Sequence, residues 1–463
     1  MSLSKQISLP VLYFLILFFL SFSISHSKLL FLFEHCRHGA RSMSHLDKND
    51  KDFIGELWNG KAELSYVGMR QHYLLGVNNK YKYSELLNFS EYNPNDIIVY
   101  ATNSNRTIMS AQSQLIGMYG SNSSMEKLDD KQKEMATLPF KITDDNILNK
   151  IKELNDNVLP YNFVLSHPIH LVDTRDKLFQ FEKNGGCPRI KNQRYKNQEK
   201  KEIVKTFANE FNKTFGKQLL DYYNGTINNS DFFSDFDNIG DVTGGIIINT
   251  VDGRDLSRFS NYNIDLDLLL KKAYEYAAIA ATEINSNDSE NEIALASSSV
   301  LMRKILNEMN NIVENDKKNI IESTNPKFFF LSAHDGTVVT HEDLLRVLFN
   351  ITIESPVFAS NLFFELHKEN DNYRVDILFN DKLQATMNYT YFKEKIEKET
   401  WTYEQTGIYC GFIEKKSNWL LYTILFVVGI VLLLVVVLVI IMIKKKRNKN
   451  AIDIKTAPLV PEK

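Results

Sequence analysis

The stretch at 29–41, with the sequence LLFLFEHCRHGAR, constrains the fold more than any other part of the chain. It begins as a short apolar, aromatic-rich run, which is typical of a buried β-strand. Buried strands of α/β sheets deliver functional groups just past their carboxyl ends. We therefore expect Arg37, His38 and Arg41 at one edge of a sheet, where Gly39 leaves room for a ligand or another backbone segment to approach.

The residue types at this strand end suggest chemistry on phosphate. Arginine carries a permanent charge on a planar group whose donors match phosphate oxygens. Two arginines around one imidazole would hold an oxyanion with the histidine aimed at its central atom, and histidine can serve as a covalent nucleophile. The alternative is a surface turn with the sequence Arg-His-Gly, so the hypothesis depends on partners elsewhere in the chain.

Two later strands are expected to end in groups of the same kind. The run DIIVYA at 96–101 is followed by Arg106, and KFFFLSA at 327–333 ends in His334 and Asp335. Each group alone fits a structural role, as a helix-capping acid or a satisfied core histidine. Together with the first strand, they place three arginines, two histidines and one acid at three carboxyl ends of one sheet. This coincidence favours a single active site.

The remaining pattern predicts an α/β fold with a helical insertion, from apolar residues at helical or alternating spacing. Helices are expected at 107–119, at 266–284, at 294–313 and at 340–348. Another helix is expected through Ile203, Phe207, Phe211 and Phe215, which recur every four residues, with Gly216 as the stop. Strands 360–367 and 373–379 should form a hairpin. The region from about 130 to 315 is therefore expected to be a mostly helical cap, inserted into an α/β core of 28–130 and 315–412.

The amino terminus has the pattern of a secretory signal peptide. Residues 1–27 contain Lys5, an apolar core at 7–22 and then small polar residues. A signal anchor that stays in the membrane is the alternative, but the apolar core is shorter than the ~20 residues that a span needs. We expect cleavage near Ser25 or Ser27.

The carboxyl terminus predicts a membrane anchor. Residues 419–443 carry no charge, and as a helix this segment would span about 37 Å, more than the ~30 Å hydrocarbon core of a bilayer. The basic cluster at 444–447 marks the cytoplasmic side. We therefore expect a single-pass type I membrane protein with an ectodomain at 28–418 and a cytosolic tail at 444–463.

The charge balance argues against nucleic acid as a partner. The formal net charge is −3, and 444–463 holds seven Lys or Arg against two Asp or Glu, so the rest of the chain carries −8. A mildly acidic ectodomain lacks the basic surface that nucleic acid requires. Glycosylation sequons fit an exported ectodomain, among them those at Asn88, Asn122, Asn212, Asn224, Asn350 and Asn388. We expect the sequon at Asn105 to stay empty, because a glycan there would block Arg106.

The chain has three cysteines, so an oxidising compartment leaves one unpaired. We expect Cys187 and Cys410 to form a disulfide and Cys36 to be a buried thiol. A metal site built from His35, Cys36 and His38 is the alternative, but no further ligand has suitable spacing.

Several stretches resemble the histidine acid phosphatases, the second branch of the histidine phosphatase superfamily. The likeness covers most of 28–412 and is carried by RHGAR at 37–41, NRTIMSAQ at 105–112, LSAHDGTV at 331–338, GGCPR at 185–189, the segment 294–312 and the late Cys410. The resemblance implies a phosphoglycerate-mutase-like mixed sheet with flanking helices and an inserted helical cap. The carboxyl-terminal helix and short tail resemble the arrangement of the lysosomal members.

The resemblance also implies a role for each site residue. His38 would be the nucleophile that takes the phosphoryl group, and Asp335 would protonate the leaving alcohol. The phosphate oxygens would be bound by Arg37, Arg41, Arg106 and His334. Water would then hydrolyse the phosphohistidine. No metal or other cofactor is implied, because the arginines supply the charge that Mg²⁺ supplies elsewhere.

The expected function is a membrane-anchored acid phosphatase that hydrolyses phosphate monoesters through a phosphohistidine. A phytase-like enzyme selective for inositol phosphates is one alternative, but the chain has no run of basic residues that would bind a polyanion. A catalytically weak cell-surface binding protein on the same fold is another, against which both His38 and Asp335 are present. Met43 stands where the family pattern has proline, which puts substrate preference in doubt.

The expected partners are small phosphomonoesters, with phosphoproteins and a homodimer left open. The ectodomain should lie in the lumen of a lysosome or endosomal vacuole, or outside the cell at its surface.

Overall fold

The structure is a computed structural model of the chain. The residues that it describes are 27–42, 62–89, 95–120, 168–172, 187–189, 198–223, 231–251, 256–281, 288–320, 325–414 and 419–455, with single residues at 60, 93, 145, 149, 227 and 253. The predicted signal peptide lies outside the described residues except for Ser27.

A seven-stranded mixed sheet forms the centre of the larger of two compact units, Met1–Gly411. Its strands are β1 (Lys28–Arg37), β2 (Ile97–Ala101), β3 (Ile169–Leu171), β4 (Phe328–Ala333), β5 (Asn361–Glu369), β6 (Asn372–Phe379) and β7 (Lys382–Asn388). The order is β3-β2-β4-β1-β5-β6-β7, in which the first four strands run parallel and the last three continue antiparallel. Arg37 pairs with Ala333, so the carboxyl ends of β1 and β4 meet at one edge.

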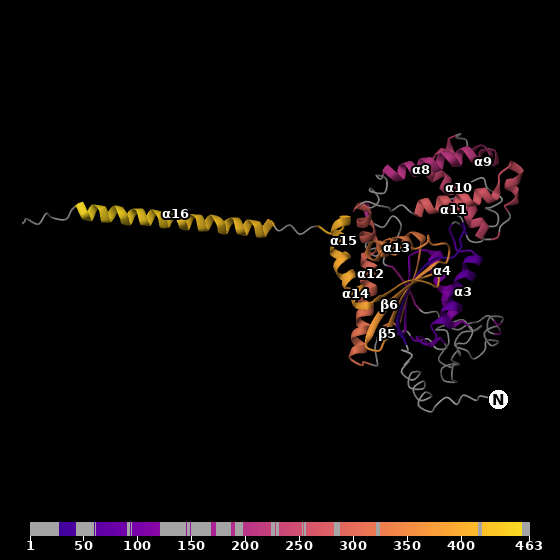
Figure 1. Ribbon diagram of the computed structural model, residues 1–463, viewed down its shortest axis with the longest axis horizontal. Coiled ribbons are helices and arrows are strands. Elements are labelled where there is room, and N and C mark those ends of the chain that lie inside the picture. Colours follow the sequence, from indigo (N-terminus) through magenta and orange to yellow (C-terminus); the bar gives the residue numbers. More distant parts are fainter. Residues whose placement is uncertain are drawn as a thin grey trace, which may run out of the picture. The chain divides into compact units, whose positions relative to one another are not determined.

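Helices cover both faces of this sheet (Figure 1). They are α3 (Tyr66–Lys82), α4 (Asn105–Tyr119), α12 (Asp288–Lys317), α13 (Asp335–Phe349) and α14 (Tyr389–Glu399). Phe31 and Phe33 of β1 belong to a core that includes side chains of α12, α13 and α14. Leu32 and Cys36 belong to a core on the α4 side. Successive residues of β1 therefore point to opposite faces, and both faces are buried, which explains the continuous apolar run in the sequence.

Helices α3 and α4 pack so closely that their backbones touch. A Cβ on Gly76 of α3 or on Gly117 of α4 would overlap the backbone of the other helix. The same closeness continues beyond β1, where a Cβ on Gly39 would lie 2.6 Å from the Cα of Gly68. The first two contacts hold α3 against α4, and the contact between Gly39 and Gly68 holds α3 against the loop that follows β1.

A separate cluster of helices lies between β3 and β4 in the sequence (Figure 1). It contains α8 (Gln198–Phe211), the π-helix η2 (Asn212–Gly216), α9 (Lys217–Tyr222), η3 (Phe232–Ser234), α10 (Phe236–Val251), η4 (Ser257–Tyr262) and α11 (Leu266–Ala281). The phenylalanines at 207, 211 and 215 are buried in a core of their own, as their spacing predicted, whereas Ile203, the first residue of that pattern, is 53% exposed. The prediction that Gly216 ends this helix is wrong.

The helical path continues through Gly216 because this glycine has right-handed helical backbone angles. A glycine ends a helix when it takes a left-handed conformation, and Gly216 does not. A Cβ at this position would overlap the Asn212 side chain. The glycine therefore permits close packing inside a helix.

Three further elements differ from the sequence expectations. Helix α13 begins at Asp335 and not near Thr340, so His334 is its N-cap residue. Strand β7 was not predicted, although its sequence KLQATMN alternates polar and apolar residues; it is largely exposed. Helix α3 was missed because its buried residues are glycine, histidine and asparagine, which give no apolar stripe.

Cys187 and Cys410 are joined by a disulfide, with their Cα atoms 4.7 Å apart. Cys410 is the last residue of α15 (Tyr403–Cys410). Cys36 is a free, buried thiol.

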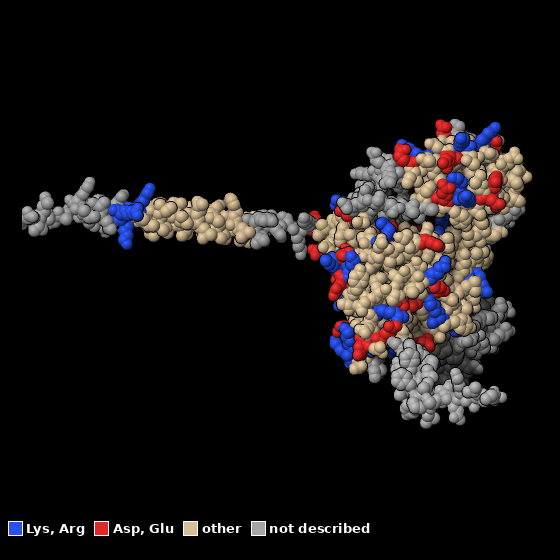
Figure 2. All heavy atoms as spheres, in the orientation of Figure 1, with Lys and Arg blue, Asp and Glu red and all other residues tan. Residues whose placement is uncertain are grey.

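The second compact unit, Phe412–Lys463, contains one long helix, α16 (Trp419–Lys455). Its segment Thr423–Arg447 is long and apolar enough to cross a membrane, and no other helix in the described part of the chain passes this test. Figure 2 shows the uncharged surface of α16 and the blue cluster of basic side chains at 444–447 that follows it. This pattern fits the predicted membrane anchor.

Candidate active site

The structure brings the predicted site residues together at the carboxyl ends of β1 and β4. Arg37 ends β1, Arg106 lies in the first turn of α4, and Asp335 starts α13. The His38 and His334 rings lie with their centroids 5.5 Å apart. An Arg106 Nη2 to His334 Nδ1 distance of 3.1 Å and an Arg37 Nη2 to Asp335 Oδ2 distance of 3.0 Å connect the three chain segments.

The backbone that carries His38 has a partner for every polar group. The N–H groups of Arg37 and His38 donate to the carbonyls of Ser360 and Ala333. The N–H groups of Gly39 and Ala40 donate to the side chains of Ser110 and Gln71. The carbonyl groups of the four residues from Arg37 to Ala40 accept, in that order, from His72, the Ala359 N–H, the His38 side chain and Ser65. Because no backbone group is left to seek water, this segment has one well-defined conformation.

The His38 side chain is fixed in one tautomer. Its Nδ1 lies 2.8 Å from the carbonyl oxygen of Gly39, which can only accept, so Nδ1 carries the proton. The pKa of His38 lies well below 6.5, chiefly because the ring is buried and also because Arg37 and Arg106 are cationic. The ring is therefore neutral, and Nε2 keeps a free lone pair, as a nucleophile requires.

His334 is a neutral hydrogen-bonding partner. Arginine can only donate, so Arg106 Nη2 donates to His334 Nδ1, and His334 Nε2 must carry the proton that it shares with Thr102 Oγ1 at 2.9 Å. Burial, followed by the charge of Arg106, lowers the pKa of His334 to about 4. His334 therefore contacts the Arg106 guanidinium through a defined tautomer. Both of its ring nitrogens are engaged with Arg106 and Thr102 in this structure, so its predicted role in binding phosphate oxygens stays a prediction.

Arg37 contacts several parts of the site. Besides Asp335, its guanidinium contacts the Pro356 carbonyl through Nη1 at 2.9 Å, and its Cζ lies 4.2 Å from the centroid of the Phe358 ring. Its Nε is buried without a hydrogen-bond partner among the described residues. This N–H group therefore has unused hydrogen-bonding capacity inside the site.

Three guanidinium groups converge with a single acid. The pKa of Arg41 is lowered to about 10, chiefly by burial and then by the neighbouring charges of Arg106 and Arg37, while Asp335 opposes these effects. Such mutual repulsion is relieved when an anion binds. The arrangement therefore suits a phosphate group with several negative oxygens.

The loop before β5 adds an aromatic residue to the site. Phe358 packs on the His38 ring with a centroid distance of 5.8 Å, and the next residue, Ala359, has a φ of 61°. This left-handed conformation is costly for alanine, yet it lets the Ala359 N–H donate to the His38 carbonyl. Phe358 lies in the uncharged stretch 355–360, which contains none of the motifs recognised in the sequence, so it could not have been identified.

The predicted glycosylation sites fall in different environments. Asn88, Asn350 and Asn388 are exposed, whereas Asn212 is half-buried and donates from its side chain to Ser234 Oγ at 3.0 Å. Asn122 and Asn224 lie outside the described residues. Asn105 is exposed beside Arg106 and donates to Glu63.

The alternative metal site from His35, Cys36 and His38 does not form, because β1 alternation sends His35 and Cys36 to opposite faces. His35 bonds to His341 and Thr337, and Cys36 enters the core on the α4 side. Elsewhere in the described part of the chain, the side chains of Glu365, His367 and Asp376 gather with their ligand atoms within 4.8 Å of one another. Lys82, Tyr83 and Arg374 already contact these carboxylates, so we interpret the group as an ion-pair network.

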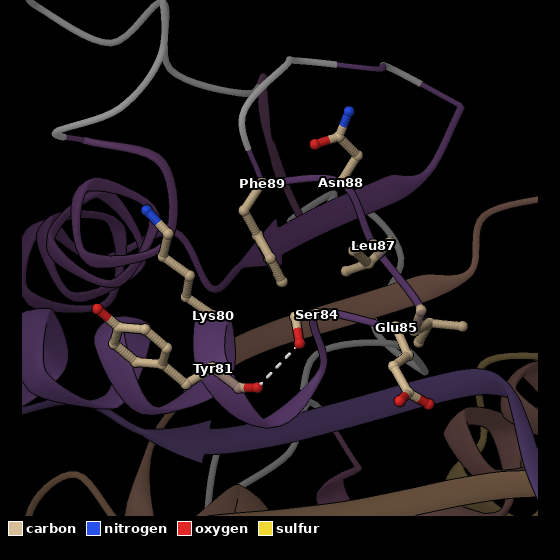
Figure 3. A pocket seen from close by; sticks show the side chains of 8 residues that line it. Lys80, Tyr81, Ser84, Glu85, Leu87, Asn88 and Phe89 are labelled. Atoms are coloured by element: carbon tan, nitrogen blue, oxygen red, sulfur yellow. Dashed lines mark hydrogen bonds between the residues drawn. The ribbon is translucent and has the colours of Figure 1, made fainter.

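A pocket of about 510 Å³ lies away from these residues, at the end of α3 (Figure 3). Lys80, Tyr81, Ser84, Glu85, Leu86, Leu87, Asn88 and Phe89 line it. None of the site residues described above contributes to this pocket.

Residues 23–380 match the sequence profile of the histidine phosphatase superfamily (branch 2). Lysosomal acid phosphatase from Xenopus laevis is 40% identical over 83 residues, which are 18% of this chain and 19% of that protein. Prostatic acid phosphatase from Homo sapiens is 35% identical over 108 residues, 23% of this chain and 27% of that protein. Both alignments therefore span less than a third of the relative's length.

Solved structures show the same fold at low identity. A phytase from Citrobacter braakii has a TM-score of 0.54 and 12% identity, covering 81% of this chain and 98% of that one. A multiple inositol polyphosphate phosphatase from Bifidobacterium longum, in complex with inositol hexasulfate, has a TM-score of 0.51 and 13% identity, covering 82% and 94%.

Proposed function

The chain belongs to the histidine phosphatase superfamily, branch 2, and from this premise we propose that it is an acid phosphatase acting on phosphate monoesters through a phosphohistidine. The observation that carries the proposal is the state of His38. Its proton is held on Nδ1 by Gly39, its Nε2 is free, and three arginines surround it.

In the first step, His38 Nε2 attacks phosphorus and the bond to the leaving oxygen breaks. Asp335 gives its proton to that oxygen, so the alcohol leaves neutral. Arg37, Arg41 and Arg106 hold the three remaining phosphate oxygens and spread the charge that builds up in the transition state.

In the second step, water attacks the phosphohistidine. The Asp335 carboxylate takes a proton from the water as its oxygen bonds to phosphorus, and the bond from phosphorus to Nε2 breaks. Inorganic phosphate leaves, and His38 recovers its lone pair.

The ion pair between Arg37 and Asp335 prepares this cycle. A phosphate group that binds Arg37 displaces the Asp335 carboxylate from it. Loss of the cationic partner and arrival of a negative phosphate both favour the protonated carboxyl group, which is the form that can donate. The side chain of Asp335 is 53% exposed, which gives it room to move and access to solvent protons.

The apolar helix α16 would anchor the ectodomain as a single-pass type I protein, with 444–463 in the cytosol. Together with the stretch similar to a lysosomal acid phosphatase, this suggests a lysosomal, vacuolar or cell-surface location. The natural substrates in this proposal are phosphomonoesters that reach that side of the membrane, with phosphoproteins as a further class.

The test is a substrate panel on full-length protein in detergent with EDTA present. Nitrophenyl phosphate, glycerol phosphate and phytate should show whether the enzyme is broad or selective. We expect broad hydrolysis in acid and at least a ~10⁴-fold loss in His38→Ala, because no other nearby group can form the covalent intermediate. Wild-type protein that hydrolyses none of the three, or an active His38→Ala variant, would contradict the proposal, and activity confined to phytate would favour the phytase alternative.

A further inference from the structure

A buried histidine of α3 contacts the peptide that carries His38. His72 is fully buried, and its Nε2 lies 3.1 Å from the carbonyl oxygen of Arg37. Its Nδ1 lies 3.0 Å from Oε1 of Gln114, which comes from α4. The two ring nitrogens therefore join β1 to α4 through one side chain of α3.

The orientation of the Gln114 side-chain amide determines how many protons the His72 imidazole carries. Gln114 Nε2 donates to Glu34 Oε2 at 2.7 Å, which leaves its Oε1 as the atom that faces His72. The other neighbour of the imidazole is a backbone carbonyl. Both ring nitrogens thus face oxygen atoms that can only accept, and only an imidazole protonated on both nitrogens satisfies both contacts.

Glu34 supplies the matching negative charge from the buried strand β1. Its oxygens accept from the side-chain amides of Asn79 at 2.8 Å, of Gln114 and of Asn361 at 3.2 Å. Three donors and no acceptor around a carboxyl group favour its ionised form.

Burial acts against both charges in this network. It lowers the pKa of His72 and raises the pKa of Glu34, and the nearby Asp381 adds to the latter. With Gln114 oriented as it lies, discharging the two groups would leave one His72 nitrogen opposite an acceptor without a proton between them. The neutral state therefore requires the Gln114 amide to turn over, so that its Nε2 donates to His72 and its Oε1 accepts from a protonated Glu34. The orientation of Gln114, with Oε1 towards His72, points to the charged pair.

We propose that His72, charged and held by Gln114 and Glu34, is a positioning residue that fixes the Arg37–His38 peptide and thereby the nucleophile. The proposal rests on the function proposed above for His38. The N–H of this peptide donates to Ala333 on β4, and its carbonyl accepts from His72, so the peptide plane is held from both sides.

The position of Nε2 depends directly on this plane, because His38 is the residue that the peptide bond leads into. A displacement of about 1 Å can cost on the order of 10² in rate even when binding groups are intact. Loss of His72 should therefore reduce turnover more than phosphate binding, since the phosphate-binding side chains do not contact it in the described structure.

Two near-isosteric variants separate the contacts of His72. In His72→Gln the amide nitrogen can take the place of Nε2 and still donate to the Arg37 carbonyl. In His72→Asn it can take only the place of Nδ1, so the bond to Arg37 is lost. His170→Gln is the matched control, because His170 is exposed on β3.

The kcat of full-length protein should then differ between the two variants. We expect His72→Asn to lower kcat by about 10-fold to 100-fold, with the inhibition constant of inorganic phosphate changed less than about threefold. His72→Gln should retain most of the kcat that His72→Asn loses, and the control should match wild type. Equal kcat in both variants, or a loss in His72→Asn that matches only its folded fraction, would overturn the positioning role.

The charge pair is tested without reference to activity. Full-length protein labelled with ¹⁵N at histidine, and assigned with His72→Gln, should show both His72 ring nitrogens protonated at neutral pH. Glu34→Gln should lower the thermal unfolding midpoint, and adding His72→Gln should recover part of that loss, because an unpaired buried charge is removed. A neutral His72 spectrum would overturn the charge assignment, whereas an inactive wild type or an active His38→Ala variant would instead contradict the proposed function.

Discussion

The two strand ends that meet at the site are held in different ways. After β1, every backbone polar group from Arg37 to Ala40 is bonded, and the His38 ring is buried. After β4, the Asp335 side chain is 53% exposed, forms an ion pair with Arg37 and accepts from the Gly336 N–H. The nucleophile is thus rigidly placed, while the acid can exchange its partner.

The buried histidines on the two faces of β1 repeat this contrast. On the α3 and α4 face, His72 donates from both ring nitrogens. On the α13 face, the Nδ1 atoms of His35 and His341 lie 3.3 Å apart, so one donates and the other accepts. His35 then bonds to Thr337, whose hydroxyl donates to the His334 carbonyl.

The comparison suggests why the charges differ. A charged His72 makes a stronger hydrogen bond to the Arg37 carbonyl, whose position fixes the nucleophile. The contacts on the α13 face hold the backbone of His334 and leave the Asp335 side chain free to move. The α13 pair is neutral, because burial lowers the pKa of His341 to about 3 and that of His35 well below 6.5.

Apart from loss of the nucleophile itself, the largest expected effect lies in the arginine cluster around His38. Replacing Arg41 or Arg106 by Ala should each reduce kcat/KM on the order of 10²–10³, like the loss of one preorganised anion donor. Arg70→Ala, at a site on α3 outside the cluster, is the control and should have no such effect. Losses below tenfold in both variants would show that the arginine cluster does not bind the reacting phosphate.

At the β4 end, the effect of losing Asp335 on the reaction rate should depend on the leaving group of the substrate. Asp335→Ala should lower kcat/KM, which reports the step that releases the alcohol, by about 10²-fold on an alkyl phosphate and by much less on nitrophenyl phosphate, because nitrophenolate leaves without a proton. A leaving-group series on this variant and on His334→Ala makes the measurement. Equal losses for alkyl and nitrophenyl phosphates would remove Asp335 as the general acid.

A smaller effect tests the rigidity of the nucleophile loop. Gly39→Ala should lower kcat by roughly tenfold and also lower the unfolding midpoint, because the new Cβ would press on the Gly68 backbone and shift the loop. Gly244→Ala is the control, since nothing lies within 4 Å of its Cβ position. Unchanged kinetics in Gly39→Ala would show that the loop tolerates displacement.

The smallest effect concerns the neutral face and pH. The pKa of His341 is lowered to about 3, so below an unfolded value near 6.5 the unfolded chain binds a proton that the folded chain does not. Stability from this group is complete above roughly pH 6.5 and falls by up to about 1.4 kcal/mol per pH unit as pH drops towards 3. His341→Phe should make the fall of the unfolding midpoint between about pH 6 and 4 shallower. An unchanged slope would contradict the neutral assignment.

Much of the central sheet was predictable, because buried strands are apolar runs and three of them end in functional groups. Parallel strands place their carboxyl ends at one edge of a sheet, and the motifs follow three such strands. This explains the convergence of the site residues, which are Arg37, His38, Arg106, His334 and Asp335. The supports were not predicted. Glu34 and His35 interrupt an apolar strand, and that interruption was an available signal.

Other features could not be found from one sequence. His72 and Gln114 are ordinary polar residues until the α3–α4 crossing brings them together, and glycine contacts that permit this crossing have no periodic pattern. The start of α13 at Asp335 depends on a strand-to-helix junction that propensity does not mark.

The most direct test of the account is to trap the covalent intermediate. Full-length protein is mixed with a ³²P-labelled phosphomonoester, quenched in alkaline detergent, and mapped by peptide mass spectrometry. We predict an alkali-stable, acid-labile phosphate on the peptide that contains His38, absent in His38→Ala and accumulated when water attack is slowed in Asp335→Ala. Turnover of the ester without label on His38, or label on another residue, would contradict His38 as the nucleophile.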